Sequence, residues 1–413
     1  MKQFKLTFIL TVLMSMVGLQ AFADFNTSKK IQVGDLYYYL DKDKLQAQVA
    51  PGWYTRDKEI PREIKYDGRT YRVTSIVNNA FSQMQGLTSV IIPNCVKSIG
   101  ESAFFGCTGL TSVTKLWGTI GRKAFKGCSR LTSVSFNSAN IKSEAFYDCS
   151  GLTSVTFEFS VDIESEAFYG CSGLTSVSIP SNSKIKQGAF KNCSSLTSVT
   201  LMSTYIFAEK CTSSNNMKSI FGDQVTEYVI GDMVWGEIQD YAFTGCSAMT
   251  SIIFGNGIRS IGKAAFSGCY GLTSVTIPQD VRSIGESAFY SCSGLTSITI
   301  GNNVTSIGDY AFFNCSGLTS VTVLNTTPVA ITKDVFTNRT NATLYVPQGS
   351  KEAYLEADYW KEFKEIIEID VTGIDQIMNN GQNNTTIFTL DGKRISKPQK
   401  GINIIDGKKV VVK

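Results

Sequence analysis

The sequence contains no histidine among its 413 residues. Without an imidazole, the chain can form neither a Ser-His or Cys-His nucleophile pair nor a metal site with histidine ligands. This absence excludes a large share of enzyme mechanisms. No sequence motif indicates a bound cofactor, so we expect no catalytic site, no metal site and no cofactor.

The sequence also lacks a strong charge bias, since 39 Lys and Arg residues are balanced by 35 Asp and Glu residues. This balance gives no basic surface of the kind that nucleic-acid binding requires. The one long apolar run stands at the N-terminus, where lysines precede an apolar segment from Leu6 to Val17 and a small-residue motif at 21–23. This arrangement predicts a cleaved signal peptide over residues 1–23 and an exported chain without a membrane span.

The chain is rich in copies of one segment, which centres on an Ala-Phe pair. The alanines of this pair are Ala80, Ala103, Ala124, Ala145, Ala167, Ala189, Ala242, Ala265, Ala288 and Ala311. The steps between them are 21 to 23 residues, except for one step of 53. A period near 22 lies in the range of leucine-rich repeats, in which each turn buries its apolar face only against its neighbours.

Each copy keeps the same apolar positions, as the segment VTSIGDYAFFNCSGLTSVTV at 304–323 illustrates. Its final L-x-x-V-x-V alternation predicts a short strand with Leu318, Val321 and Val323 directed inward and Thr322 directed outward. We expect about eleven such turns, stacked through parallel strands into a mainly β repeat solenoid roughly 50 Å long.

The unit LTSVTIPxxVxSIGxxAFxxC closely resembles the BspA-like, or Treponema-type, class of leucine-rich repeats, over roughly residues 76–324. The resemblance implies a right-handed leucine-rich repeat stack of the kind found on surface proteins of host-associated bacteria. It also implies adhesion to host matrix proteins or to other cells, and it does not identify the ligand.

Nine of the 11 cysteines occupy one position of the repeat, where the first copy has Met84. Methionine fills apolar space but cannot bridge or act as a thiolate, so we interpret these cysteines as a buried column of packing residues; their disulfide state stays open. The degenerate copy between 193 and 242 is interpreted as two turns, one of them lengthened. In it we expect Cys211 at the cysteine position and an inverted Ala-Phe pair at 205–211. Cys95 aligns with loop residues and is expected to be exposed.

Two outward features are candidates for partner binding. The exposed strand positions carry a ladder of hydroxyls, which could be a contact surface or could reflect only the strand preference of threonine. Aromatic residues that interrupt the repeat are our candidate partner-binding residues, because exposed aromatics often anchor interfaces. They are Trp117, Phe159, Tyr205, Phe207 and Trp235. Trp235 could alternatively only fill the irregular turn.

One pair of carboxylates, Glu286 and Asp309, occupies the same position in neighbouring copies. Two carboxyl groups one strand spacing apart would suit a retaining glycosidase. Lys263 fills this position in the preceding copy and no cleft is predicted there, so we interpret the row as charged loops and not as a catalytic pair.

Both ends of the repeat array need a cap, because an open stack exposes strand edges. Residues 24–75 alternate like a small sheet with a turn at Asp67-Gly68, which predicts an N-terminal β cap. Residues 325–370 are expected to form the C-terminal cap, with a last strand at 340–347 and an amphipathic helix at 349–366.

The tail at 371–413 contains the segments DGKRI, KGINII and KKVVV. This layout resembles the C-terminal sorting domain of the type IX secretion system, which implies display at the outer membrane of a Gram-negative cell. A small terminal β hairpin without a sorting role is the alternative.

The sequence therefore predicts an exported, cell-surface leucine-rich repeat protein that binds an extracellular protein or glycan and mediates adhesion. A glycan-capture module and a structural surface-layer scaffold are the alternatives. Aromatics coplanar with the hydroxyl ladder would favour glycan capture, whereas an apolar patch on the irregular copy would favour protein binding.

Overall fold

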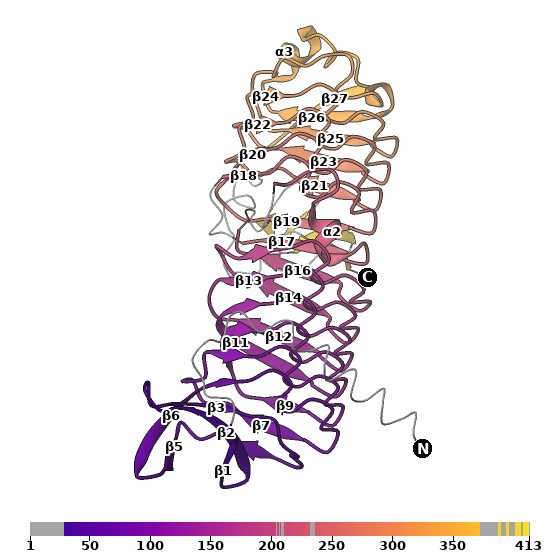
Figure 1. Ribbon diagram of the computed structural model, residues 1–413. Helices are drawn as coiled ribbons and strands as arrows, with labels where there is room; N and C mark the ends of the chain where they lie inside the picture. The colour runs from indigo at the N-terminus through magenta and orange to yellow at the C-terminus, as the bar shows by residue number, and fades with distance from the viewer. Residues whose placement is uncertain are drawn as a thin grey trace.

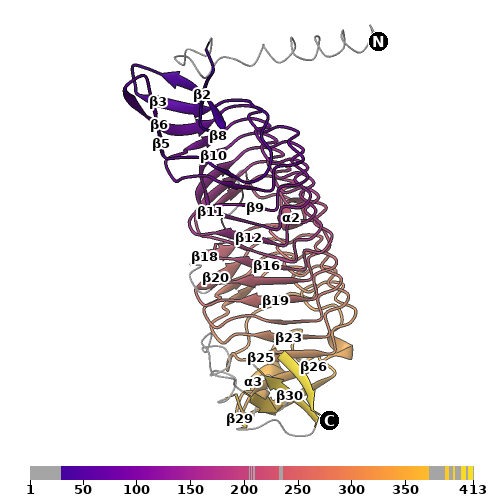
Figure 2. The ribbon, with the colours of Figure 1, turned by 90° about the horizontal axis from the view of Figure 1, so that it is seen from below.

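The computed structural model describes residues 29–203, 205, 207, 210–231 and 236–371, together with the backbone of four later strands. This part of the chain forms an elongated, mainly β solenoid of about 14 turns with little helix, as Figure 1 and Figure 2 show. The stack is longer than the eleven turns that we expected, because segments at both ends continue it.

The first side of the solenoid is a ladder of parallel strands built from the L-x-x-V-x-V segments. It is interrupted between β12 and β14 and between β19 and β21. Its strands are β4 (Lys58–Glu59), β7 (Ser89–Ile91), β9 (Ser112–Val113), β11 (Ser133–Ile141), β12 (Ser154–Phe157), β14 (Ser176–Ile179), β16 (Ser198–Leu201), β17 (Glu227–Ile230), β19 (Ser251–Phe254), β21 (Ser274–Thr276), β23 (Ser297–Ile300), β25 (Ser320–Val323), β26 (Thr343–Pro347) and β27 (Glu365–Ile369).

A second ladder of shorter parallel strands follows the next side of each turn, and β11 is long enough to belong to both ladders. The isoleucine of the S-I-G segment is its inward residue. The strands are β3 (Gln46–Val49), β6 (Arg69–Ile76), β8 (Ser98–Ile99), β10 (Leu116–Ile120), β11, β13 (Val161–Ile163), β15 (Lys184–Ile185), β18 (Gly236–Ile238), β20 (Ile258–Ile261), β22 (Ser283–Ile284) and β24 (Ser306–Ile307).

The third side of each turn is a run of tight backbone turns around the Ala-Phe pair. Here the phenylalanine amide donates a hydrogen bond to the alanine carbonyl of the next turn, for example from Phe104 to Ala124 at 2.6 Å. The residue before the alanine has a positive φ in all ten copies, such as 60° at Tyr310. Because left-handed backbone is costly for residues other than glycine, the turn-to-turn hydrogen bonds hold this geometry against its cost.

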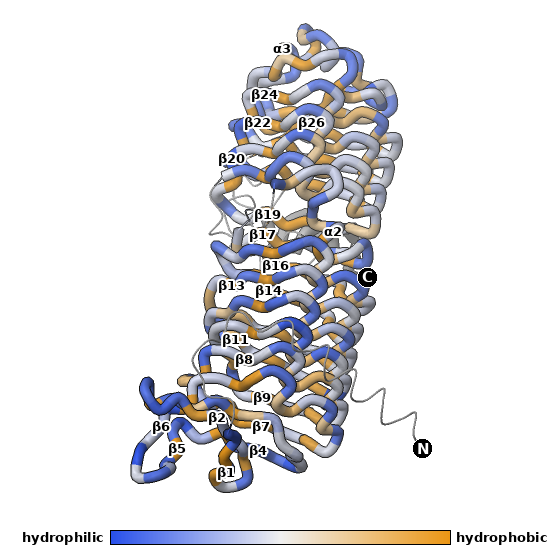
Figure 3. Tube along the Cα trace, in the orientation of Figure 1, coloured by the Kyte–Doolittle hydropathy of each residue, from blue (hydrophilic) through white to orange (hydrophobic). Residues whose placement is uncertain are grey.

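A column of aromatic rings fills the interior, one ring above the next. Hydrophobic residues accordingly recur at the same places in successive turns (Figure 3). Between Phe81 and Phe221, and again between Phe243 and Phe336, consecutive ring centroids lie 4.8 to 5.4 Å apart. The column consists of Tyr54, Phe81, Phe104, Phe125, Phe146, Phe168, Phe190, Phe221, Phe243, Phe266, Phe289, Phe312, Phe336 and Trp360.

Nine of the cysteines form a second interior column, as expected, and all 11 are free and buried. In eight turns the thiol donates a hydrogen bond to a phenylalanine carbonyl of the preceding turn at 3.0 to 3.2 Å. The expectation for Cys95 was wrong. It is 4% exposed, because its loop folds back over the N-terminal cap, where the thiol approaches the Arg62 carbonyl at 3.7 Å.

The degenerate copy contains two turns, one of them lengthened, and this expectation is confirmed. Phe207 pairs with Ile185 and so occupies the isoleucine position, not an inverted Ala-Phe pair. Phe221 takes the phenylalanine position and stacks on Phe190. It lies 14 residues after Phe207, whereas in a regular turn the phenylalanine lies 5 residues after the isoleucine, as Phe190 does after Ile185. The added residues lead into a short helix, α2 (Met217–Phe221), whose N-cap Asn216 closes a capping box with Ser219.

The N-terminal end is a small sheet joined to the stack. An antiparallel meander of β1 (Ile31–Val33), β2 (Leu36–Asp41) and β3 precedes a hairpin of β5 (Glu63–Tyr66) and β6. Asp67 and Gly68 form the hairpin turn with φ values of 49° and 72°, as expected. Because β3 pairs in parallel with β6, and β6 with β8, the sheet continues directly into the second ladder.

At the C-terminal end the expected strand at 340–347 is present as β26, whereas the expected long helix is not formed. The α-helical part of this end is α3 (Lys351–Glu356). A 3-10 turn, η2 (Arg339–Asn341), precedes β26. After α3 the segment of the expected helix forms turns, and only its last two residues, Glu365 and Ile366, belong to β27, which pairs in parallel with β26. Tyr354, Trp360 and Phe363 cover the last turn through ring contacts that begin at Phe336.

Beyond residue 371 the structure describes the backbone of one four-stranded antiparallel sheet, in the order β29-β28-β30-β31. Its strands are β28 (Ile387–Thr389), β29 (Arg394–Ile395), β30 (Gly401–Ile405) and β31 (Lys408–Val412). The expected signal peptide, residues 1–23, lies outside the described residues.

Candidate functional site

The corner between the two ladders departs most from the repeat. In regular turns such as 275–284, the inward residues that flank this corner are 9 positions apart. The separation falls to 7 at 113–120 and 134–141, and is 8 in the next three turns. The connecting loop is therefore missing where β11 runs straight through the corner, and the surface is hollowed there.

A first hollow of about 300 Å³ lies on β10, β11 and β13. Gly118 shapes it with a φ of 67°, and any side chain at this position would come within 2.1 Å of the Lys97 carbonyl oxygen. The hollow is lined by Gly118, Thr119, Ser138, Ala139, Asn140, Ser160, Val161 and Asp162.

The outward residues of the second ladder form a row that passes through this hollow. At the N-terminal side, parallel pairing joins in sequence Ser98, Thr119, Asn140, Asp162 and Lys184. At the C-terminal side, it joins Glu237, Ser260, Ser283 and Ser306. Serine fills the row at both ends, and other polar side chains replace it only along the hollowed corner.

Two of the candidate aromatics flank the first hollow, since Trp117 precedes Gly118 and Phe159 precedes Ser160. Trp117 is partly buried, with the Lys97 ammonium 5.0 Å from its ring centroid. Phe159 is 58% exposed. The two residues stand two turns apart, about 10 Å along the stack by strand spacing.

Charged side chains hold the loop that carries Phe159. Glu158 makes an ion pair with Lys115, two turns away. Asn137 in the intervening turn donates a hydrogen bond to Glu158 at 3.1 Å. The loop is therefore fixed to its neighbours while the Phe159 ring remains exposed.

A second hollow of about 380 Å³ lies at the lengthened turn. It is lined by Lys184, Tyr205, Phe207, Lys210, Cys211, Glu237, Gln239 and Asp240. Lys184 and Glu237 belong to the same outward row as the first hollow. The two hollows therefore follow one another along a single corner.

The remaining candidates differ in exposure at this second hollow. Tyr205 is 47% exposed and available to a partner. Phe207 is 6% exposed, so its assignment as a surface residue was wrong, because it packs in the isoleucine position. Trp235 lies outside the described residues.

Cys211 does not take the cysteine position of the column, contrary to expectation. In a regular turn the cysteine lies between the phenylalanine and the leucine. In the lengthened turn these two positions are held by Phe221 and Val225, and no cysteine lies between them. Cys211 lies instead beside the second hollow, where burial and the nearby Asp240 carboxylate raise its thiol pKa to about 12. A thiol with that pKa is an inert packing group and not a nucleophile.

The structure thus brings Trp117, Phe159 and Tyr205 together along one corner, although their positions in the sequence are far apart. They do not lie on the outer face of the first ladder, where the hydroxyls are. The large apolar residues exposed on that face are Ile91 and Ile253. Glu286 and Asp309 line neither hollow; Glu286 pairs with Lys263 at 2.9 Å and Asp309 accepts a hydrogen bond from Thr332.

Sequence reasoning missed a second set of outward aromatics, on the third side. Tyr147 and Tyr169 stack with centroids 4.7 Å apart, and Tyr290 and Phe313 stack at 5.6 Å. Each directly follows an Ala-Phe pair, at a position where one further copy has Phe105 and the remaining copies have lysine, serine or threonine. The signal was present in the triplets AFY and AFF, but their similarity to the repeat concealed it.

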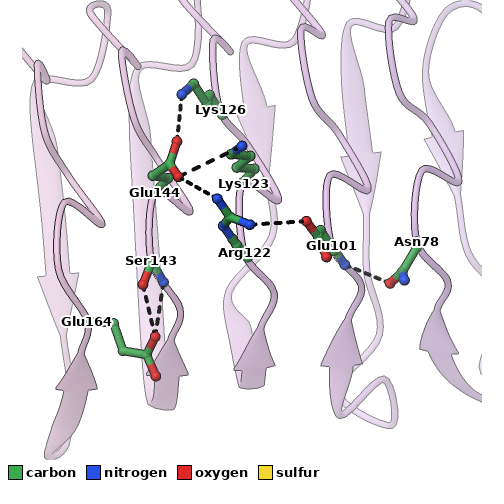
Figure 4. Close-up of polar contacts among 8 residues, drawn as sticks. All are labelled: Asn78, Glu101, Arg122, Lys123, Lys126, Ser143, Glu144 and Glu164. Carbon is green, nitrogen blue, oxygen red and sulfur yellow. Dashed lines mark hydrogen bonds and ion pairs between the residues drawn. The ribbon is translucent and has the colours of Figure 1, made fainter. Parts of the chain in front are cut away.

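A charged network beside this aromatic set links three turns (Figure 4). Lys126 and Arg122 donate hydrogen bonds to Glu144 at 2.6 and 3.2 Å. Partial burial alone would raise the pKa of Glu144, but these two hydrogen bonds hold the pKa below its ordinary value. The Lys126 ammonium also lies 3.9 Å from the Tyr147 ring centroid.

Glu144→Gln is expected to lower the free energy of unfolding by up to about 1 kcal/mol at neutral pH. Because the folded-state pKa is lowered, this stabilisation is present above the ordinary carboxyl pKa of 4.5 and is lost as pH falls below it. Urea titrations at neutral pH and at about pH 3 measure this difference. The control is Glu101→Gln, since Glu101 is exposed and 4.0 Å from Arg122; an equal loss in both variants would contradict a specific role for Glu144.

Among the described residues, no group of three or more acidic or cysteine side chains is placed to hold a metal ion. In the same part of the chain, no helix has the length and hydrophobicity to cross a bilayer.

Comparison with known proteins gives a repeat-family match. A model of the BspA type leucine rich repeat region matches residues 74–118, 115–219 and 218–343, which is more than half of the chain. No curated protein matches.

Several solved structures are similar to this chain. A leucine-rich repeat protein from Bacteroides ovatus is 23% identical over 71% of this chain and 94% of that one, with a TM-score of 0.32. A leucine rich cell surface protein from Faecalibacterium prausnitzii is 25% identical with the same coverage and a TM-score of 0.35. A leucine rich repeat protein from T. pallidum is 23% identical over 59% of this chain and 91% of that one, with a TM-score of 0.32.

Proposed function

The chain belongs to the BspA-type leucine-rich repeat family, and from this premise we propose that it is an exported surface protein that binds an extracellular macromolecule. The ligand would be a protein of a host matrix or of another cell surface. The observation that carries the proposal is the corner between the ladders, where Trp117, Phe159 and Tyr205 interrupt the repeat beside two hollows.

The geometry of this corner suits binding better than catalysis. Interfaces depend on a few aromatic anchors surrounded by polar contacts, and the three aromatics have that setting. The hydroxyl ladder of the first side has no such anchors on its face. A role as a structural surface-layer scaffold would instead use the ends of the stack, and would not require the central corner to differ from the repeat.

The route to the surface is part of the proposal. The basic and apolar segments at 1–23 have the composition of a cleaved signal peptide. The tail at 371–413 would act as a type IX sorting domain, and its DGKRI, KGINII and KKVVV segments support this assignment.

The test is surface plasmon resonance of the full chain over immobilised matrix and serum glycoproteins. We expect saturable binding that falls at least about tenfold in the triple variant Trp117→Ala, Phe159→Ala, Tyr205→Ala, because truncated aromatic anchors typically cost 1 kcal/mol or more each. Tyr270→Ala is the control, since Tyr270 is 56% exposed and lines neither hollow. Unchanged affinity in the triple variant, with its thermal unfolding also unchanged, would show that the corner is not the binding site.

A further inference from the structure

We propose that the first hollow binds a carbohydrate chain, so that the ligand of this corner is the glycan of a glycoprotein. This inference rests on the proposed function, since it names the chemistry that the same corner would recognise. It begins from the lining residues, of which Thr119, Ser138, Asn140, Ser160 and Asp162 are polar.

The polar groups are arranged as a row of hydrogen-bonding partners. Thr119, Asn140 and Asp162 are register partners on three neighbouring strands, so they stand about 4.8 Å apart. They offer a hydroxyl, an amide and a carboxylate, which together supply donors and acceptors. A sugar ring presents hydroxyl groups of both kinds along its edge, and this row matches them.

One of these groups is buried without a partner. The Asn140 side-chain oxygen is buried and accepts no hydrogen bond from the described residues. A buried acceptor without a donor costs about 1–3 kcal/mol, so a ligand hydroxyl that donates to it would recover free energy. Solvent does not reach this oxygen, so a ligand hydroxyl would donate to it once the Asn140 carboxamide turns toward the hollow.

The flanks of the hollow provide apolar contacts for the faces of sugar rings. Trp117 and Phe159 stand on either side of the intervening turn, and their spacing of about 10 Å would place them beside alternate units of an extended saccharide. The Lys97 ammonium over one face of Trp117 leaves that ring partly buried, whereas the Phe159 ring is mostly exposed. Phe159 is therefore the main apolar contact.

An extended peptide fits the hollow less well than a saccharide. Peptide strands bind by adding to a sheet edge, but β10, β11 and β13 each pair with neighbours on both sides. No strand edge is open at the hollow. Its polar lining also lacks the apolar pockets that peptide side chains need for specificity.

The test is binding of the full chain to an array of N-linked, mucin-type O-linked and bacterial cell-wall oligosaccharides. In parallel, the immobilised glycoproteins are measured before and after enzymatic deglycosylation. We expect array binding that falls about tenfold in Asn140→Ala and in Phe159→Ala, which is the loss of one good hydrogen bond or one stacking contact. Asp162→Asn, at an exposed position, is a second variant that leaves the packing intact.

The controls are Ser306→Ala, at the serine end of the same row, and Tyr270→Ala; neither should alter binding. Glycoprotein binding that survives deglycosylation but fails in the Trp117 and Phe159 variants would overturn the glycan inference and leave the proposed function standing. Array binding that is insensitive to Asn140→Ala, Phe159→Ala and Asp162→Asn would also overturn the inference, because the sugar would bind elsewhere. Absence of binding to every glycoprotein and glycan would overturn both.

Discussion

Raising the pH to about 10 is expected to unfold the protein, although it is stable at neutral pH. The cause is the interior column of cysteines. Burial raises the thiol pKa to about 12 at Cys107, Cys149, Cys246 and Cys315. It also raises the thiol pKa well above 9.0 at Cys128, Cys171, Cys269 and Cys292.

The sign follows from where the protons are bound. Below pH 9 the thiols are protonated in both states, and they contribute no pH dependence. Above pH 9 the unfolded chain releases thiol protons that the folded chain retains. The unfolded state is therefore stabilised relative to the folded state by about 1.4 kcal/mol per thiol for each pH unit. For eight thiols the loss at pH 10 is on the order of 10 kcal/mol, comparable with the total stability of a typical domain.

Chemical denaturation at intervals between about pH 7 and 10 measures this loss. The double variant Cys269→Ala, Cys292→Ala should lose about 3 kcal/mol less than the wild type over the same interval, whatever its stability at neutral pH. This comparison separates the thiols from the buried tyrosines, which also ionise in the unfolded chain. An identical pH slope in the double variant and the wild type would show that the thiols do not control alkaline stability.

Phe146→Ala is expected to lower the free energy of unfolding by about 3–5 kcal/mol, the usual cost of a cavity left by a core aromatic. Phe146 is fully buried in the aromatic column, with Phe125 at 5.0 Å and Phe168 at 5.1 Å on its two sides. The substitution removes both stacking contacts and an edge contact with Phe136 at 5.6 Å, and leaves a gap in a stack whose turns contact only their neighbours. The backbone of these turns is held by hydrogen bonds on three sides, which limits collapse into the gap.

Urea unfolding followed by circular dichroism measures this cost, and the neighbouring variant Tyr147→Ala is the control. Tyr147 is partly exposed and stacks on Tyr169 at the surface, so its removal should cost no more than about 1 kcal/mol. Similar losses in the two variants would show that the interior column does not dominate the stability of the stack.

The sequence was informative wherever the repeat constrained it. The inward positions, the parallel strands and the cysteine column could be predicted because each copy repeats the same pattern of burial. Met84 in place of cysteine favoured a packing column, and the structure adds that its thiols are free. The turn at Asp67-Gly68 was predictable from local backbone preference alone.

The failures occurred where position depends on tertiary contacts. Phe207 and Phe221 each follow an isoleucine in the lengthened turn. Only the pairing of Phe207 with Ile185 and the stacking of Phe221 on Phe190 show which one keeps the phenylalanine position. The segment at 349–366 has helical periodicity throughout. However, β27 begins at Glu365, near the end of this segment, and pairs in parallel with the strand edge that β26 leaves open. The hollows arise from loops shortened by one or two residues, whose effect depends on the longer loops beside them.

The absence of disulfides among the 11 cysteines has a mechanical consequence. In the proposed role, the chain would be tethered to the surface at one end and bound to a ligand, and movement of the cell would pull it along its length. With no covalent cross-link between turns, tension would peel the stack one turn at a time. Each turn of about 23 residues would lengthen the tether by roughly 70–80 Å, so the solenoid would dissipate a sudden load before the bond to its ligand breaks.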